Sequence, residues 1–300
     1  MGGIAIFCGF FVSTLIWVDF QYWGEIKFIL AALFVIFFIG VRDDLVPLRA
    51  FVKLIGQIMA ACLLIFLFDL RIRSMFGLFG VYDLPLLASY TVTVFTIIAI
   101  TNSFNLIDGL DGLAGTIAII ALICFGSWFY LVNDHIFAII SFTMCGAIFA
   151  FLIFNWEPSE VFMGDTGALV IGMALAIFAI RFMDLNYALP ADHPYRFYGT
   201  ISTAACFIMI PLVDTSRIII LRLWKRQSPF KPDKSHIHHA IMRLGKSHSQ
   251  TTMILGATQI FFVIIAVVFR DTGDLRLLAG IVLLSILLSV FLDRLILKKL

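Results

Sequence analysis

Long apolar stretches alternate with short polar segments along the whole chain. A helix that crosses a bilayer needs roughly 17–25 mostly apolar residues, and ten stretches reach or approach this length. The pattern therefore predicts an all-α, polytopic membrane helical bundle of about ten transmembrane helices. The ten apolar stretches comprise residues 3–18, 26–41, 51–68, 84–101, 113–132, 136–154, 168–183, 200–224, 252–269 and 275–297.

The composition supports the same class. Hydrophobic residues make up 62% of the chain, charged residues 13%, and the mean hydropathy is +1.06. A soluble domain needs about a quarter of its residues charged, so that class is excluded. The net charge of +2 gives no reason to expect a nucleic-acid partner, and the lipid bilayer is the surrounding implied by the composition.

The distribution of basic residues predicts the orientation in the membrane. The longest polar loop, 224–250, contains six lysines and arginines but only one acid, Asp233. Cytoplasmic loops carry such an excess, so this loop is predicted to be cytoplasmic. Counting back two spans at a time places 155–167, 102–112 and 42–50 on the same side. Arg71 and Arg73, in a loop that this count makes external, are a weaker signal in the opposite direction.

The first of these cytoplasmic segments holds two adjacent carboxylates, Asp43 and Asp44, after Arg42. A single acid there would be explained as a solvated helix end. Adjacent carboxylates disfavour joint ionisation unless a cation or a base role stabilises them, which favours a functional site. Arg49 and Lys53 follow closely.

The segment NSFNLIDGLDG is the most specific of the polar clusters. Asn105, Asp108 and Asp111 recur every three residues and are predicted to project from one side of a helical turn. An ordinary capped loop would explain one aspartate but not this density of polar groups at the hydrocarbon boundary, where they are costly.

The segment FMGDTG precedes the apolar stretch that begins at Ala168. Asp165 or Thr166 is explained in one interpretation as the N-cap of that helix. In the other, the glycine-flanked helix start offers free backbone N–H groups to a phosphate, and Asp165 supplies a hard oxygen ligand for Mg²⁺.

Three of the six histidines lie in HIHH, as His236, His238 and His239. No cysteine or separated fourth ligand accompanies them and lysines lie nearby, so we expect an exposed, anion-binding loop rather than a zinc site. His248 is expected to be an ordinary surface residue. Asp214 and Arg217, three residues apart, are interpreted as a structural ion pair.

At these residues the chain resembles the polyprenyl-phosphate N-acetylhexosamine-1-phosphate transferase family, of the glycosyltransferase 4 type. The segments RDD with Lys53, NSFNLIDGLDGLAG, FNWEPSEVFMGDTG and SPFKPDKSHIHH resemble its cytoplasmic signature loops, in the same order and along essentially the whole chain. The HIHH loop behind PDK resembles the undecaprenyl-phosphate GlcNAc-1-phosphate transferase-like branch that starts O-antigen and related surface glycans.

The resemblance implies transfer of a sugar 1-phosphate from a UDP-N-acetylhexosamine, with UDP-GlcNAc expected, to undecaprenyl phosphate, releasing UMP. This would be the first membrane step of O-antigen, capsule or wall polysaccharide synthesis in a bacterial inner (plasma) membrane. It implies Mg²⁺ as cofactor, with Mn²⁺ as an alternative, and is compatible with a homodimer. The lipid phosphate would attack the sugar-linked phosphorus directly, with Asp44 or Asp43 as an optional base. A covalent aspartyl-phosphate route is the open alternative.

The roles expected from the resemblance fall into three groups. They are catalysis by Asp43, Asp44, Asp108, Asp111 and Asp165; substrate binding by Lys53, Asn102, Asn105, His236, His238 and His239; and metal binding by Asp165 and Asn105.

The chain departs from the family pattern at its start. Members with this loop usually carry an additional N-terminal span before the glycines that here are Gly2 and Gly3. A single integral-membrane domain, 1–300, lacking that first helix, is therefore expected. Two rival interpretations are a catalytically silent shortened paralogue or partner subunit, and a transporter, which would place its acids near the membrane midplane.

Overall fold

The computed structural model describes residues 2–224, 226 and 236–297. It confirms the all-helical prediction: this part of the chain contains no strand beyond a single bridge between Ser74 and Asp83. The helices are α1 (Gly2–Trp17), α2 (Trp23–Leu45), α3 (Ala50–Leu67), α4 (Leu86–Ile107), α5 (Leu113–Leu131), α6 (His135–Asn155), α7 (Gly164–Ala188), α8 (Thr200–Phe207), α9 (Met209–Trp224), α10 (Ile237–Arg243), α11 (His248–Val268) and α12 (Asp274–Leu297), with short 3₁₀ turns at Phe20–Tyr22 and Leu78–Gly80.

The ten predicted apolar stretches all correspond to helices. In the described part of the chain, eight are long and apolar enough to cross a membrane, and the bent pair α8 and α9 makes a ninth if it is one span. The remaining stretch is α1, whose 16 residues fall just short of the usual spanning length. Much of loop 224–250 lies outside the described residues, as do Lys298 and Lys299.

The stretch 200–224 was expected to be one continuous run, and this expectation is wrong. The chain breaks at Ile208, and α8 and α9 meet at an angle of 93°. Pro211 in the first turn of α9 has no backbone N–H to donate. Gln259 of α11, fully buried, satisfies two groups at the break: its amide donates to the Cys206 carbonyl at 2.8 Å and its oxygen accepts from Ile210 N–H at 3.0 Å. Because irregular backbone inside a membrane requires such partners, Gln259 permits the bend.

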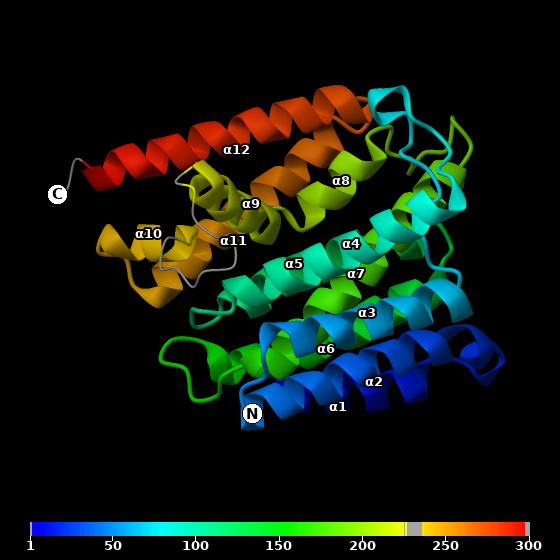
Figure 1. The fold of residues 1–300 in the computed structure, drawn as a ribbon, viewed down its shortest axis with the longest axis horizontal. Coiled ribbons are helices and arrows are strands. Elements are labelled where there is room, and N and C mark those ends of the chain that lie inside the picture. The colour runs from blue at the N-terminus through cyan, green and yellow to red at the C-terminus, as the bar shows by residue number, and fades with distance from the viewer. Residues whose placement is uncertain (1, 225, 227–235, 298–300) are drawn as a thin grey trace.

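Helix α7 lies at the centre of the bundle. Its sequence is apolar on all sides between Ala168 and Ile180, which is typical of a helix surrounded by others. It packs against α1, α2, α4 and α5, and 83% of its spanning window is buried. At the other extreme, only 17% of the α12 window is buried, and α12 lies at the edge of the bundle (Figure 1).

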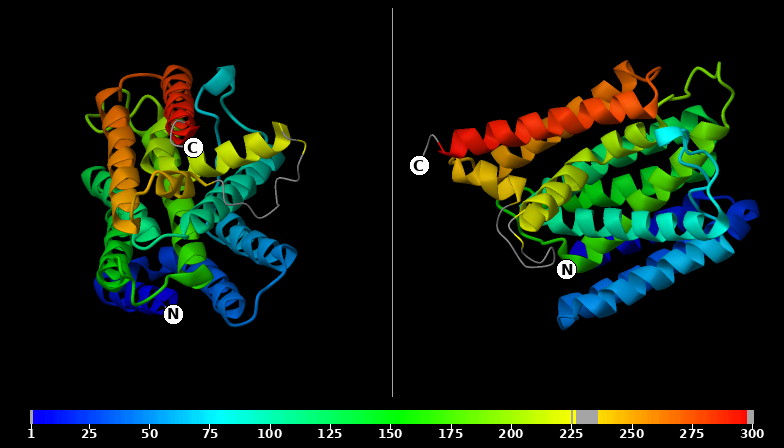
Figure 2. Two further views of the ribbon diagram at one scale, coloured as in Figure 1. Left: turned by 90° about the vertical axis from the view of Figure 1, so that its left-hand side faces the viewer. Right: turned by 45° about the horizontal axis from the view of Figure 1, so that its top comes forward.

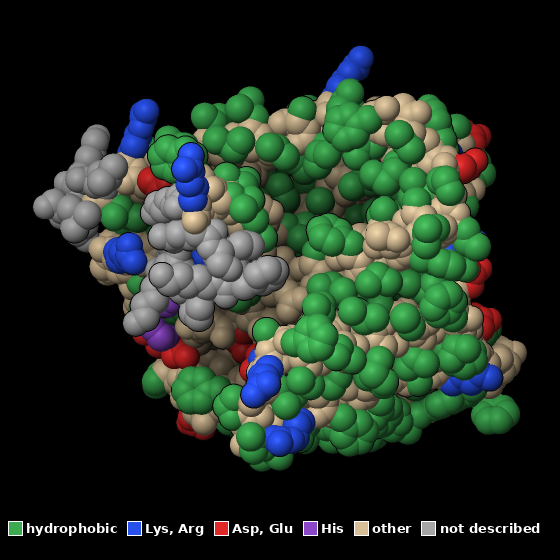
Figure 3. Space-filling view, in the orientation of Figure 1, with side chains coloured by type: hydrophobic (Ala, Val, Ile, Leu, Met, Phe, Trp, Pro, Cys, Tyr) green, Lys and Arg blue, Asp and Glu red, His purple; other side chains and the backbone are tan. Residues whose placement is uncertain are grey.

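All the predicted polar clusters that the structure describes lie at one end of the bundle, which we call the site end. There α2, α4, α6 and α9 end, and α1, α3, α5, α7 and α11 begin (Figures 1 and 2). The space-filling view shows acidic, basic and histidine side chains gathered at this end beside a broad apolar flank (Figure 3). The predicted convergence of the clusters on one face is therefore confirmed.

Candidate active site

The carboxylate of Asp44, at the end of α2, caps the start of α7. Its two oxygens accept hydrogen bonds from the Asp165 N–H at 2.8 Å, the Thr166 N–H at 3.2 Å and the Thr166 hydroxyl at 2.5 Å. A carboxylate at a helix N-terminus is stabilised by the unpaired N–H groups and the helix dipole. The expectation that these two N–H groups are free for a phosphate is therefore wrong, because a side chain from another helix occupies them.

Glycines allow the backbones to approach closely at this junction. Gly164 has a φ of +71°, and a Cβ there would lie 2.7 Å from Asp44 Oδ2. Gly40 lets α2 lie directly against Thr166, where any side chain would collide with the α7 backbone. Glycine is thus required both by the turn that starts α7 and by the contact that brings Asp44 to it.

The start of α1 supports the same segment from the other side. The N–H groups of Gly2 and Gly3 donate to the carbonyl oxygens of Phe162 and Met163, each at 2.9 Å. A side chain on Gly3 would collide with Gly167 of α7. The first helix therefore holds the FMGDTG segment in place.

Lys53 connects the first and third polar clusters. Its ammonium, in the first turn of α3, forms an ion pair with Asp43 of α2 and lies 3.3 Å from Asp165 Oδ2. The Leu48 N–H donates to the other oxygen of Asp43 at 2.6 Å. The Asn105 amide of α4 donates to Asp165 Oδ1 at 2.6 Å. Residues from four helices, separated by up to 122 positions, thus form one polar centre around Asp165.

Asp108 lies beside this centre, just after the end of α4. Burial and the charges of Asp165 and Asp44 raise the pKa of its carboxyl to about 7. Within the described residues, no group donates a hydrogen bond to it. An ionisable carboxyl whose pKa lies near neutrality, next to other acids, is typical of a functional site.

Asp111 points elsewhere. It accepts a hydrogen bond from the Ser159 hydroxyl at 2.8 Å and lies 3.1 Å from the imidazole of His248. The idea that it projects from the same helical side as Asn105 and Asp108 is wrong, because α4 ends at Ile107 and Gly112, with a φ of +74°, turns the chain. Asp111 thus links the loop after α4 to the loop before α7 and to α11, and His248 is more than a surface residue.

Asn102 is engaged within the bundle. Its amide exchanges hydrogen bonds with Gln57 of α3 at 2.8 and 3.2 Å, and it also donates to the Ile98 carbonyl at 2.8 Å. The structure therefore places Asn102 in the packing of α3 against α4, about one helical turn before Asn105.

The histidine segment is buried, not exposed as expected. His236 and His238 are 7% and 3% exposed. His236 Nδ1 lies 2.7 Å from Asp214 of α9, whose second oxygen accepts from the Ile237 N–H at 2.7 Å. Asp214 thereby fixes the start of α10 and does not simply pair with Arg217, which contacts Asp293 instead.

His238 brings α10 to the loop after α4. A Cβ on Gly109 would lie 3.1 Å from His238 Nε2, so the ring packs on this glycine next to Asp108. Burial lowers the pKa of His238 to about 4, with the neighbouring histidines acting in the same direction. His238 is therefore neutral at physiological pH. The rings of His238 and His239 lie 4.3 Å apart.

Several residues at this end escaped the sequence analysis. Asn155 ties two loops together, accepting from Gly112 N–H at 2.9 Å and donating to the Val161 carbonyl at 2.8 Å. Gln57 was detectable in principle, since it is a polar residue inside an apolar stretch, and Asp214 was noticed but assigned the wrong partner. Their partners depend on which helices become neighbours, which the sequence pattern does not specify.

The acids of the polar centre are candidate ligands for a divalent cation. Among the described residues, no three histidine, cysteine, aspartate or glutamate side chains form a ready-made metal cluster. The oxygens of Asp43, Asp44 and Asp165 are engaged by Lys53 and backbone or side-chain donors. Asp108 lies beside two other acids, and none of the residues that the structure describes donates a hydrogen bond to its carboxyl. Carboxylate oxygens are the ligands that Mg²⁺ prefers, so the donor chemistry fits this ion, with Asp108 and Asp165 as its candidate holders.

An all-α bundle with an acid-rich polar centre at one end defines an integral-membrane protein with a site at the membrane–water boundary. The family model described as glycosyl transferase family 4 matches residues 26–183, which include α3 to α6, most of α2 and α7, and every acid of the polar centre. The chain belongs to this family.

Relatives of known name agree with this assignment. The undecaprenyl-phosphate alpha-N-acetylglucosaminyl 1-phosphate transferase of Yersinia pestis is 29% identical over 278 residues, which cover 89% of this chain and 72% of that protein. The transferase of the same name from Escherichia coli O157:H7 is 30% identical over 260 residues, 85% and 68% of the two chains. A probable undecaprenyl-phosphate N-acetylglucosaminyl 1-phosphate transferase of Bacillus subtilis is 30% identical over 132 residues, 44% and 34%. The matched region is thus about a third of the Bacillus protein and about two thirds or more of the other two.

Proposed function

We propose that this protein transfers a sugar 1-phosphate from a UDP-N-acetylhexosamine, with UDP-GlcNAc favoured, to undecaprenyl phosphate and releases UMP. The observation that carries the proposal is the polar centre in which Lys53 joins Asp43 to Asp165 beside Asp108. Family membership and the names of the relatives support the reaction class. The basic loop 224–250 supports a cytoplasmic site, and we assign the protein to the bacterial inner membrane.

The position of the centre supports transfer rather than transport. The acids lie at helix ends on one side of the bundle, where a water-soluble nucleotide and a membrane-anchored phosphate can meet. Transporters place their binding sites near the bilayer midplane.

Charge neutralisation is the main task of the site. The donor diphosphate and the acceptor phosphate bring several negative charges together, and positioning with electrostatic stabilisation dominates phosphoryl transfer. Lys53 supplies one cation directly. A Mg²⁺ ion held by Asp165 and Asp108 would neutralise phosphate oxygens when bound. Asn105 fixes the Asp165 carboxylate by its hydrogen bond.

The chemistry then needs one displacement. An oxygen of the lipid phosphate forms a bond to the sugar-linked phosphorus, and the bond from that phosphorus to the UMP oxygen breaks. The acceptor has a second pKa near 6 and is mostly dianionic at pH 7, so little base assistance is needed. The Asp44 carboxylate accepts three hydrogen bonds from α7, which favours a structural role over that of a base. A bound Mg²⁺ ion would hold the Asp108 carboxylate ionised, so its proposed role is to bind the cation rather than to take a proton.

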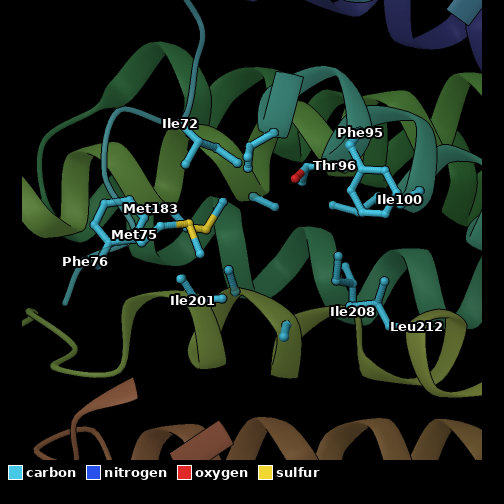
Figure 4. A pocket seen from close by; sticks show the side chains of 15 residues that line it. Ile72, Met75, Phe76, Phe95, Thr96, Ile100, Met183, Ile201, Ile208 and Leu212 are labelled. Carbon is cyan, nitrogen blue, oxygen red and sulfur yellow. The ribbon is translucent and has the colours of Figure 1, made fainter. Parts of the chain in front are cut away.

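The presence of an apolar cavity in the bundle favours an acceptor with a long isoprenoid chain. It has a volume of about 220 Å³ and lies between α4, α7, α8 and α9, with Phe95, Ile100, Met183, Ile201 and Leu212 among its walls (Figure 4). The surface is hollowed between α4 and α8 in the space-filling view (Figure 3). Part of the prenyl chain would lie here while its phosphate reaches the site end.

The test uses membranes from cells that express this protein and lack any other activity of this kind. They are incubated with undecaprenyl phosphate, Mg²⁺ and one of several UDP-N-acetylhexosamines. UMP release that requires both the lipid and one particular sugar supports the proposal and identifies the donor. Absence of release with every sugar, from protein that is folded, would refute it.

A further inference from the structure

A second apolar cavity lies at the site end, on the far side of α10 from the polar centre. It has a volume of about 330 Å³ and is bounded by α9, α10, α11 and α12. It exists because α12 packs against α8 near one end and α10 near the other, and spans the space between them as an outer wall (Figures 1 and 2).

The cavity extends about half-way across the membrane. Its walls run from Ile254 to Phe262 on α11 and from Ser285 to Leu295 on α12. At 1.5 Å per residue these segments cover roughly 12 and 15 Å. A hydrocarbon core is about 30 Å thick, so the cavity matches the depth of one leaflet. Since α11 begins and α12 ends at the site end, this is the leaflet on the side of the polar centre.

The walls are mostly apolar, with the hydroxyl-bearing Thr258, Ser285 and Ser289 among them, and the one charged residue among the described residues that line the cavity is Lys246, at one edge. Lys246 is exposed and forms no ion pair with residues 2–224, 226 or 236–297. A lysine at the rim of an apolar groove, at the level of the lipid headgroups, attracts anionic lipids and can extend its charge to the interface.

We propose that this groove binds one acyl chain of an anionic phospholipid, whose headgroup phosphate pairs with Lys246. A phospholipid of the site-end leaflet is favoured by the depth of a single leaflet, by the mostly apolar walls and by the cation at the rim, which forms no ion pair within the described part of the chain. The inference goes beyond the proposed transferase activity and does not depend on it.

The bound lipid would support the histidine segment. Ile237 and Ile241 of α10 face the groove, whereas His236 and His238 contact Asp214 and Gly109 on the other side. Filling the groove therefore fixes the helix that carries the histidines without contacting the polar centre.

The test is native mass spectrometry of the purified protein released from nanodiscs of phosphatidylcholine and phosphatidylglycerol in equal parts. Wild type should retain one phosphatidylglycerol in preference to phosphatidylcholine. Lys246→Gln should lower that preference about fivefold, the factor for one lysine near an anionic lipid. Ser289→Phe, which fills the groove, should abolish retention. Arg294→Gln is the matched control: this arginine is exposed near the same end of α12 but does not line the groove, and retention should be unchanged.

Three results would overturn the inference. Equal retention of both phospholipids by wild type and both groove variants would mean that there is no specific site. Displacement of phosphatidylglycerol by added undecaprenyl phosphate would assign the groove to the isoprenoid chain. A dimer lost in Ser289→Phe would assign it to a second copy of the chain. Because no nucleotide sugar is present, each result is independent of whether the protein is a transferase.

Discussion

Replacement of Asp44 tests whether this carboxylate holds α7 or acts as a base. Asp44→Ala removes the acceptor of three hydrogen bonds from Asp165 and Thr166. Loss of a helix cap costs about 0.5–2 kcal/mol, and each buried donor left unsatisfied costs about 1–3 kcal/mol. Since water reaches part of this region, we expect a loss of about 2–4 kcal/mol in unfolding free energy. Asp44→Asn keeps one acceptor oxygen and should lose about half of that.

Both Asp44 variants should also lower turnover, because the loss of the cap displaces Asp165. This loss of turnover should be the same at every pH. Stability is measured by heating the protein in detergent and quantifying the folded fraction by size-exclusion chromatography. Turnover is measured as UMP release from pH 6 to 9. Asp271→Asn is the control variant: this aspartate is exposed in the loop before α12, and its replacement should change neither stability nor turnover. An Asp44→Ala protein that melts like wild type and regains its rate as pH rises would refute the capping role and restore Asp44 as a base.

Three further predictions concern other parts of the molecule. The folded state keeps the Asp108 proton up to about pH 7, whereas its ordinary pKa is 3.8, so this group lowers stability as pH rises between these values. Asp108→Asn should therefore be more stable than wild type above pH 7, by up to about 4 kcal/mol, and equal below pH 4, in thermal unfolding followed across pH. Gln259→Leu should cost about 2–4 kcal/mol of unfolding free energy in the same assay, because two groups at the α8–α9 break lose their partner; unchanged melting would show that water or the lipid replaces it. In a protein without native cysteines, Arg49→Cys and Ser159→Cys should be shielded in intact cells from an impermeant thiol reagent. The same reagent should label Asp192→Cys, and labelling of Arg49→Cys or Ser159→Cys would show that the site end faces outward.

The sequence pattern was sufficient for the class and for the location of the site. Apolar stretches of spanning length predicted the helices. The basic residues of loop 224–250, together with the count of spans, predicted that all four polar clusters lie on the same side of the membrane. Asp165 and Lys53 were expected to lie near each other because residues at alternate helix ends of a membrane bundle converge on the same face, and their side chains are 3.3 Å apart. The break at Ile208 was missed because Pro211 is only one residue in an otherwise uniform apolar stretch, and its effect depends on Gln259 from another helix.

The details within the site depended on contacts that no local pattern encodes. Asp43 and Asp44 are neighbours in sequence, yet one pairs with Lys53 and the other caps α7, because successive residues on a helix point in different directions. His236 was expected to be exposed in a basic loop. It is buried because Asp214, in the middle of an apolar stretch, requires a polar partner and finds it there. Substitution of His236 should therefore reduce folded protein as well as activity.

The most direct test of the central claim follows the fate of the sugar-linked phosphorus. Purified protein is incubated with undecaprenyl phosphate, Mg²⁺ and a UDP-N-acetylhexosamine labelled at that phosphorus, with Asp165→Asn as the comparison. Transfer of a sugar 1-phosphate predicts label in the lipid product, an equal amount of unlabelled UMP, and turnover reduced by several orders of magnitude in Asp165→Asn. Label that remains in UDP while the sugar reaches the lipid, or an Asp165→Asn protein with near-normal Mg²⁺-dependent turnover, would contradict the account.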